Sequence, residues 1–168
     1  ELIKSYRKQY KRSWISLMPT NLYGPKDNFN VETGHVIPAL INKFENAKRN
    51  NLKSVKLWGS GSALREFMYV DDLADAVLFC LDNYNEDLHI NVGTGEEISI
   101  RNLAQLVSEL VGFTGTVEWD SNQPDGTPRK VLDSTKLTQI GWKPKVTLKD
   151  GLTKTIGWYL SNYESAKR

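Results

Sequence analysis

The segment Trp58-Gly-Ser-Gly-Ser-Ala-Leu-Arg-Glu-Phe-Met-Tyr-Val-Asp-Asp-Leu-Ala-Asp-Ala76 decides the fold, because a strand, a glycine turn, a second strand and a helix follow one another in it. The preceding run 55–58 predicts the first strand, and the apolar run 67–70 predicts a short buried one. Gly59 and Gly61 carry no Cβ, so the backbone between the strands can reverse and lie close to a bound group.

Arg65 is the candidate binding residue of this segment. A guanidinium group matches the paired oxygens of a phosphate or diphosphate. The alternative is an ordinary ion pair with Glu66, Asp71 or Asp72 on a solvated turn. We expect the next helix to start at Leu73, with Asp71 or Asp72 as its N-cap.

Length and composition indicate a single soluble globular domain. The chain has 168 residues, of which 39% are apolar and 25% charged, which is ordinary for a globular protein. A net charge of +2 gives no strong attraction to nucleic acid or anionic membranes. One cysteine excludes an internal disulfide framework, and no apolar run reaches the length of a membrane span. A cytoplasmic protein is therefore expected.

The start of the chain reads as the back half of a helix. Residues 1–12 have a helical apolar stripe but no initiator methionine and no helix start signal, which predicts a piece of a larger chain. Residues 14–18 predict a buried parallel strand that leads into the loop 19–25. Asn21 and Tyr23 in that loop could contact a ligand, since ligands bind beyond the carboxyl ends of parallel strands; a plain turn is the alternative.

Residues 35–49 predict an amphipathic helix with Pro38 in its first turn. His35 would then lie at the helix entrance. It could act as a general acid or base, or it could serve only as a cap or packing residue. Lys43 follows two turns later, on or near the polar face.

Further elements follow from the same periodicity. Residues 88–92 predict a strand and Ser99 the N-cap of a helix. Residues 116–120 predict another strand, and the apolar stripe after 148 a final helix.

Three other groups of side chains have a chemical interpretation. Arg129 and Lys130, on a stiff turn, could form a second phosphate clamp or a solvated basic surface. Cys80 lies on the apolar stripe 73–81 and is interpreted as a core thiol. The aspartates at 71, 72 and 75 lack histidine or further oxygen ligands nearby, so no metal site is expected.

Several motifs together resemble one enzyme family. PTNLYGP (19–25), HVIPALINKF (35–44), the segment 58–76, NVGTGEEISI (91–100) and PDGTPRK (124–130) occur in order. They resemble the carboxyl-terminal half of the GDP-L-fucose synthases, which are extended short-chain dehydrogenases/reductases.

The resemblance implies an α/β fold with two parts. Residues 1–25 would end a Rossmann-type NADP-binding domain. Residues 26–168 would form a smaller mixed α/β domain that binds the nucleotide sugar, with some segments returning to the Rossmann sheet.

The resemblance also implies site residues. The residues at the nicotinamide end of NADP(H) would be Pro19, Thr20, Asn21, Leu22 and His35. The residues that hold the GDP-sugar would be Asn21, Lys43, Trp58, Arg65, Asp125 and Lys130. His35 would be the catalytic acid, working with a cysteine elsewhere, and whole family members are usually homodimers.

Such enzymes epimerise C3 and C5 of GDP-4-keto-6-deoxy-D-mannose and reduce C4 with NADPH. The family's glycine-rich motif, catalytic Ser, Tyr and Lys, and partner cysteine have no counterpart here and would precede Glu1. The chain alone is therefore expected to be inactive. Two alternatives stay open: another nucleotide-sugar epimerase or dehydratase, and a non-catalytic nucleotide-sugar binding module.

Overall fold

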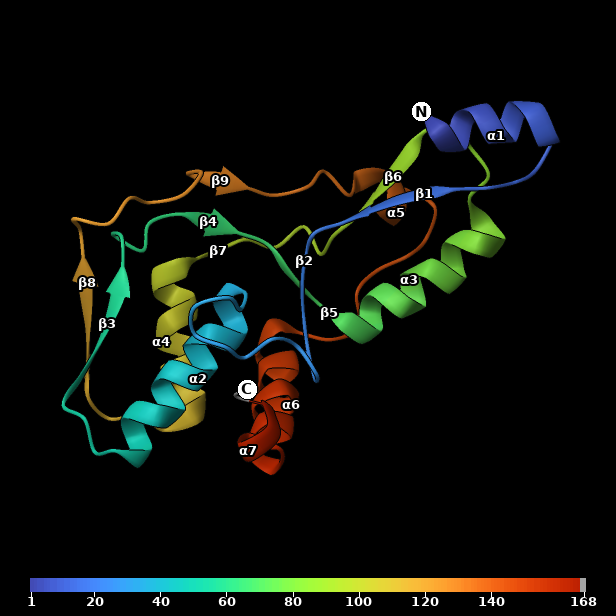
Figure 1. The fold of residues 1–168 in the computed structure, drawn as a ribbon. Coiled ribbons are helices and arrows are strands. Elements are labelled where there is room, and N and C mark those ends of the chain that lie inside the picture. Colours follow the sequence, from blue (N-terminus) through green and yellow to red (C-terminus); the bar gives the residue numbers. More distant parts are fainter. Residues whose placement is uncertain (167–168) are drawn as a thin grey trace.

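The computed structural model describes residues 1–166 and has an α/β fold with parallel strands (Figure 1). Helix α1 (Leu2–Tyr10) lies at one end and precedes β1 (Ser16–Pro19), which pairs in parallel with β6 (His89–Val92). The parallel pairing was expected, but the burial of β1 was not confirmed. Met18 is 52% exposed and no residue of β1 is buried, because β6 is its one strand partner among the described residues.

Residues 21–23 are a strand, although the sequence predicts a loop there. Strand β2 (Asn21–Tyr23) pairs in parallel with β5 (Phe67–Tyr69), whose residues are all buried. The loop interpretation failed because this three-residue strand depends on a partner 46 positions away in the chain.

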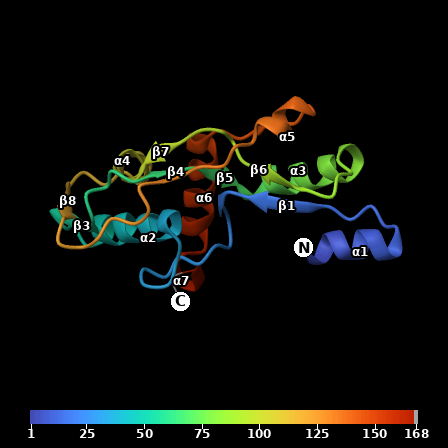
Figure 2. The same ribbon diagram turned by 90° about the horizontal axis from the view of Figure 1, so that it is seen from above.

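The far end of the molecule contains α2 (Val36–Arg49), β3 (Ser54–Trp58) and β8 (Thr116–Asp120). These elements confirm the sequence expectations for this region. Strands β3 and β8 pair in parallel along their whole length, with Trp58 opposite Asp120. Figure 2 shows α2 beside this pair, at the end of the molecule opposite α1.

The third sheet is built around β4 (Leu64–Arg65). It pairs antiparallel with β7 (Ile98–Ser99) and parallel with β9 (Arg129–Lys130). The chain therefore passes from this sheet to the β2–β5 pair within a single residue, Glu66.

Helix α3 (Val70–Asn83) starts three residues before the expected Leu73, and no side chain caps it. The predicted aspartate caps are wrong. Asp72 is buried, and its carboxylate instead accepts the backbone N–H groups of Lys145 (3.1 Å) and Val146 (3.0 Å). A contact with residues so distant in the chain leaves no local signal.

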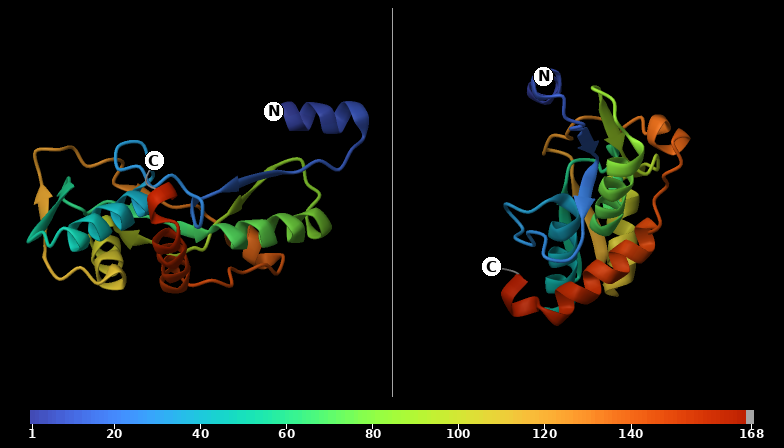
Figure 3. Two further views of the ribbon diagram at one scale, coloured as in Figure 1. Left: turned by 60° about the horizontal axis from the view of Figure 1, so that its bottom comes forward. Right: turned by 90° about the vertical axis from the view of Figure 1, so that its right-hand side faces the viewer.

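The remaining helices are α4 (Ile100–Val111), α5 (Thr135–Gln139), α6 (Leu148–Ser161) and α7 (Tyr163–Ala166). The predicted N-cap of α4 is confirmed, because the Ser99 side chain accepts the N–H of Asn102 at 3.1 Å. Figure 3 shows α6 crossing the molecule between α3 and the α2–α4 end.

Two apolar clusters form the core. The larger one gathers residues of α2, α4 and α6 around Phe29 and Tyr159, and the smaller one packs under α3 against β6 and α5. Cys80 is fully buried in the smaller cluster, as expected, and burial raises the pKa of its thiol. The apolar stripe expected over residues 73–81 of α3 is only partly buried, since Val77 and Leu81 are 37% and 62% exposed.

No helix within residues 1–166 is long and apolar enough to cross a membrane. The expected division of the chain at residue 25 stays a prediction.

Candidate functional site

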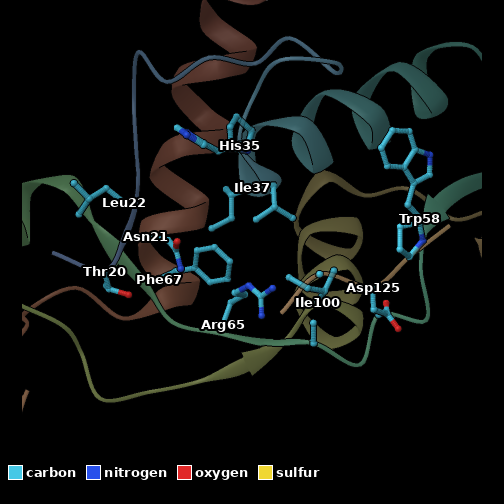
Figure 4. A pocket seen from close by; sticks show the side chains of 16 residues that line it. Thr20, Asn21, Leu22, His35, Ile37, Trp58, Arg65, Phe67, Ile100 and Asp125 are labelled. Carbon is cyan, nitrogen blue, oxygen red and sulfur yellow. The ribbon is translucent and has the colours of Figure 1, made fainter. Parts of the chain in front are cut away.

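A cavity of about 550 Å³ lies where β2, α2, β4 and α4 meet (Figure 4). Its lining comes from positions in five parts of the chain: 20–22, 35–38, 58–67, 100 and 124–126. Much of the surface is apolar, supplied by side chains such as Ile37, Phe67 and Ile100. An apolar cavity with a few convergent polar groups is the usual form of a small-molecule site.

Arg65 is the cationic group of the cavity. The last residue of β4, it points between Phe67 and Ile100 in Figure 4, and within residues 1–166 its guanidinium donates only to the Leu64 carbonyl, at 2.7 Å. Among the residues described, no carboxylate comes within ion-pair distance of it. The ion pair with Glu66, Asp71 or Asp72 is therefore not formed, and most of the guanidinium donors remain available to an anion.

Thr20 and Asn21 lie on one wall and are fixed by the same acceptor. The Asn21 amide donates to the Glu66 carbonyl at 2.7 Å, and the Thr20 hydroxyl reaches the same oxygen at 3.3 Å. Leu22 beside them adds apolar surface to the cavity. Pro19, the fourth residue of this predicted group, is exposed and does not line the cavity.

His35 stands at the rim, at the N-cap of α2, without a capping hydrogen bond. Its side chain is 81% exposed, and its Nδ1 lies 3.5 Å from Oδ1 of Asp27. The cap role is therefore not observed, and the imidazole remains open to a ligand. Sequence reasoning did not single out Asp27, because nothing local in the polar segment 26–34 indicates a contact with the ring of His35.

Trp58 stands at the opposite rim, with Lys43 beside its ring. Trp58 lines the cavity and is 73% exposed. Lys43 does not line the cavity, but its Nζ lies 5.8 Å from the centre of the Trp58 ring. Partial burial lowers the pKa of the Lys43 ammonium, since burial disfavours the charged form. The ammonium still lies within the range of a cation–π contact.

Asp125 also lines the cavity, but its carboxylate is already engaged. Oδ1 accepts the backbone N–H of Ser60 at 2.8 Å, and Oδ2 accepts the Ser60 hydroxyl at 2.7 Å. These hydrogen bonds lower the pKa of Asp125, because they stabilise the carboxylate. The contact ties residues 124–126 to the glycine turn at 59–61.

The predicted clamp at Arg129 and Lys130 lies next to the cavity and not in it. Lys130 is exposed and directly opposite Arg65 in the β4–β9 register. Arg129 pairs with Glu97 at 2.7 Å, so only Lys130 of the two has no carboxylate partner within the described chain.

Sequence reasoning missed the apolar walls and the supporting contacts of the site. In the sequence, Ile37 falls within the amphipathic helix predicted over 35–49, Ile100 follows the predicted N-cap Ser99, and Phe67 begins the predicted buried strand. Their periodicity gave the correct burial but could not show that one side of each faces a cavity. Ser60 and Glu66 carried no signal, because their partners are distant in the sequence.

The arrangement is suited to an elongated anion with an apolar or aromatic end. Arg65 offers a fork of donors near the middle of the lining, and Trp58 offers an aromatic face at one end. His35 can exchange protons with a group bound between them and the 20–22 wall.

Comparisons with known proteins identify relatives of this chain. The model of the NAD dependent epimerase/dehydratase family matches residues 1–93. The chain is 55% identical over all of its 168 residues to "Probable GDP-L-fucose synthase 1" of Oryza sativa subsp. japonica, and covers 51% of that protein. It is 46% identical to the GDP-L-fucose synthase of Escherichia coli K12, with 98% of the chain and 54% of the relative covered.

Among solved structures, a GDP-L-fucose synthetase from Naegleria fowleri bound to NADP has a TM-score of 0.90 and 32% identity. The similarity covers 99% of this chain and 53% of that one. The chain thus spans about half the length of the curated relatives it matches.

Proposed function

Since this chain belongs to the NAD dependent epimerase/dehydratase family, we propose that it forms the GDP-sugar site of a GDP-L-fucose synthase. The whole protein would epimerise C3 and C5 of GDP-4-keto-6-deoxy-D-mannose and reduce C4. The observation that carries the proposal is Arg65, a cation in a largely apolar cavity with no carboxylate partner among the residues that the structure describes. Such a group binds a diphosphate by paired, charge-assisted hydrogen bonds.

The other substrate contacts follow from that anchor. Lys130, opposite Arg65 on the neighbouring strand, would add charge to the phosphate end. Trp58 would contact the nucleotide by its exposed ring, with Lys43 beside it. Asn21 would approach the sugar. Asp125 would act through the loop that it fixes on Ser60, since both of its oxygens already accept hydrogen bonds.

His35 would be the acid of the epimerisation. Hydrogens next to the C4 ketone are acidic, so a side chain that gives and takes protons can invert C3 and C5 through enolate forms. His35 is exposed at the cavity rim, and Asp27 at 3.5 Å can orient its ring. We assign it as the catalytic residue of this chain.

The wall at Thr20, Asn21 and Leu22, with His35 at the rim and Pro19 just outside the cavity, would face the nicotinamide end of NADP(H). The residues fit such a ring, because Leu22 gives apolar surface and the Asn21 side-chain oxygen makes no hydrogen bond within the described residues. NADPH, when bound, supplies the hydride for C4. For the whole protein we propose a cytoplasmic homodimer without nucleic-acid or membrane partners.

Calorimetric titration of the chain with GDP and UDP tests the proposal. We expect GDP to bind, and Arg65→Met to weaken it about 10- to 100-fold, as the loss of charge-assisted hydrogen bonds requires. Arg12→Met, which removes an exposed arginine that does not line the cavity, is the matched control and should leave binding unchanged. Absence of GDP binding would contradict the proposal, and a preference for UDP would favour another nucleotide-sugar enzyme.

A further inference from the structure

We propose that Glu66 is the positioning residue of this site, fixing Arg65 relative to Thr20 and Asn21. The inference rests on the proposed function, since it concerns how the same site is held in shape. Glu66 itself does not line the cavity, so its effect on a ligand would pass through its neighbours.

The place of Glu66 in the fold supports this role. The chain leaves the β7–β4–β9 sheet at Arg65 and enters the β2–β5 pair at Phe67, so Glu66 is the one residue between them. Its neighbours Arg65 and Phe67 both line the cavity. In extended backbone the side chain between two such neighbours points the opposite way, which directs the Glu66 carboxylate into the protein.

The carboxylate is fully buried and held by neutral donors from two distant segments. Oε1 accepts the N–H of Gly95 at 2.8 Å and the hydroxyl of Thr94 at 3.4 Å, and Oε2 accepts the N–H of Leu132 at 3.0 Å. Within residues 1–166 it forms no ion pair. Hydrogen bonds are directional, and the donors to this buried carboxylate are backbone N–H groups and a hydroxyl. The position of the carboxylate is therefore restricted by where those donors lie.

The backbone carbonyl oxygen of Glu66 holds the cavity wall at Thr20 and Asn21, which the proposed function places next to the cofactor. It accepts from Asn21 at 2.7 Å and from Thr20 at 3.3 Å. One residue thus connects β2, the loop after β6 and the segment after β9. A shift of Glu66 would move Arg65 relative to Thr20 and Asn21. The proposed function places Arg65 at the diphosphate of the GDP-sugar, and Thr20 and Asn21 next to the nicotinamide and the sugar.

The space around the carboxylate allows little adjustment. A Cβ on Gly93 would lie 2.3 Å from Oε1 of Glu66 and 2.6 Å from the Ser134 hydroxyl. In Glu66→Gln the side-chain NH₂ would have to face the N–H of Gly95 or of Leu132. Two donors cannot pair, so the backbone there must move.

GDP titration and NMR of the chain test the proposal. Glu66→Gln should weaken GDP binding about tenfold, although no atom of Glu66 lines the cavity. It should also shift the side-chain amide resonances of Asn21. Val111→Ala, a buried substitution at the far end of α4, controls for lost stability: it should lower the melting temperature and leave both readouts unchanged.

Thr94→Val removes one donor from Oε1 and serves as the milder variant if Glu66→Gln does not fold. It should weaken GDP binding about two- to threefold. Unchanged GDP affinity in both variants, or Asn21 amide resonances that stay in place while those of Gly95 and Leu132 move, would overturn the positioning role. If the unchanged chain binds no GDP, the proposed function is what fails, and the NMR comparison still decides the role of Glu66.

Discussion

At the scale of single residues, the shape of the site depends on the absence of a side chain at Gly61. Gly61 has φ +74°, a conformation that favours glycine, and a Cβ there would lie 2.6 Å from the Trp119 ring. Trp119 cannot retreat easily, because Arg101 lies over it at 4.7 Å and also donates to the Ser60 carbonyl. Trp119 and Arg101 therefore hold one side of the glycine turn. On the cavity side, the backbone N–H of Ser60 donates to Asp125.

Gly61→Ala is accordingly expected to destabilise the chain more than Gly95→Ala does. Gly95 has φ +76° but nothing within 4 Å of an added Cβ, so the pair separates the backbone cost from the steric one. We expect about 1 kcal/mol for Gly95→Ala and about 1–3 kcal/mol more for Gly61→Ala. Urea unfolding measures both, and equal losses would contradict the steric account.

Residue identities that matter chemically could be predicted from the sequence, whereas their partners could not. Arg65 and His35 were found from their motifs, and both line the cavity. The contacts of Glu66 and of Asp125 were not predicted, because their partners lie up to 66 and 65 positions away. Lys130 was expected in the site, but it lies beside the cavity and its role stays a prediction.

At the scale of elements, periodicity predicted the long helices and the strands β3 and β8. It failed where an element is short or where a side chain acts across the fold. Strand β2 was missed, and the start of α3 was wrong by three residues. Asp72 and Asp75 illustrate the cause, since these two carboxylates of α3 accept hydrogen bonds from residues 142–146 and do not cap their own helix.

Asp75, on α3, makes the stability of the chain depend on pH. Hydrogen bonds from Lys145 and then from the Trp142 ring N–H lower the pKa of this carboxyl. A lowered folded-state pKa means stability that is present above the ordinary aspartate value of about 3.9 and is lost as pH falls through the folded value.

Asp75→Asn should therefore melt below the unmodified chain at pH 7, with the two melting temperatures converging below about pH 3.9. Melting curves from pH 7 down to pH 3, read by circular dichroism, follow the difference. Asp71→Asn, an exposed neighbour on the same turn, is the control and should show no such convergence. A difference that is constant over pH would contradict the assignment.

At the scale of the whole molecule, the α/β class follows from alternating strand and helix patterns, but the arrangement around the cavity does not. The site requires three small sheets, β2–β5, β3–β8 and β7–β4–β9, to meet correctly, and each pairing joins positions far apart in the chain. No local pattern encodes which strand pairs with which.

Because the cavity lining comes from five parts of the chain, GDP should stabilise them together. At a hundredfold excess over its Kd, a ligand adds about 2.7 kcal/mol to the free energy of unfolding. Hydrogen exchange should slow at segments 20–22, 35–38, 58–67 and 124–126 on adding GDP, and stay unchanged in α1. Slowing confined to one of these segments would contradict a shared site.

The exposed ring of Trp58 has an optical consequence. An indole in water fluoresces at longer wavelength than one in an apolar interior, so Trp58 contributes red-edge emission while Trp142, which is 3% exposed, contributes blue-edge emission. A nucleobase that stacked on Trp58 would quench part of this long-wavelength emission, to which Trp14, 43% exposed, also contributes. The chain thus carries its own label for measuring occupancy, without any dye attached.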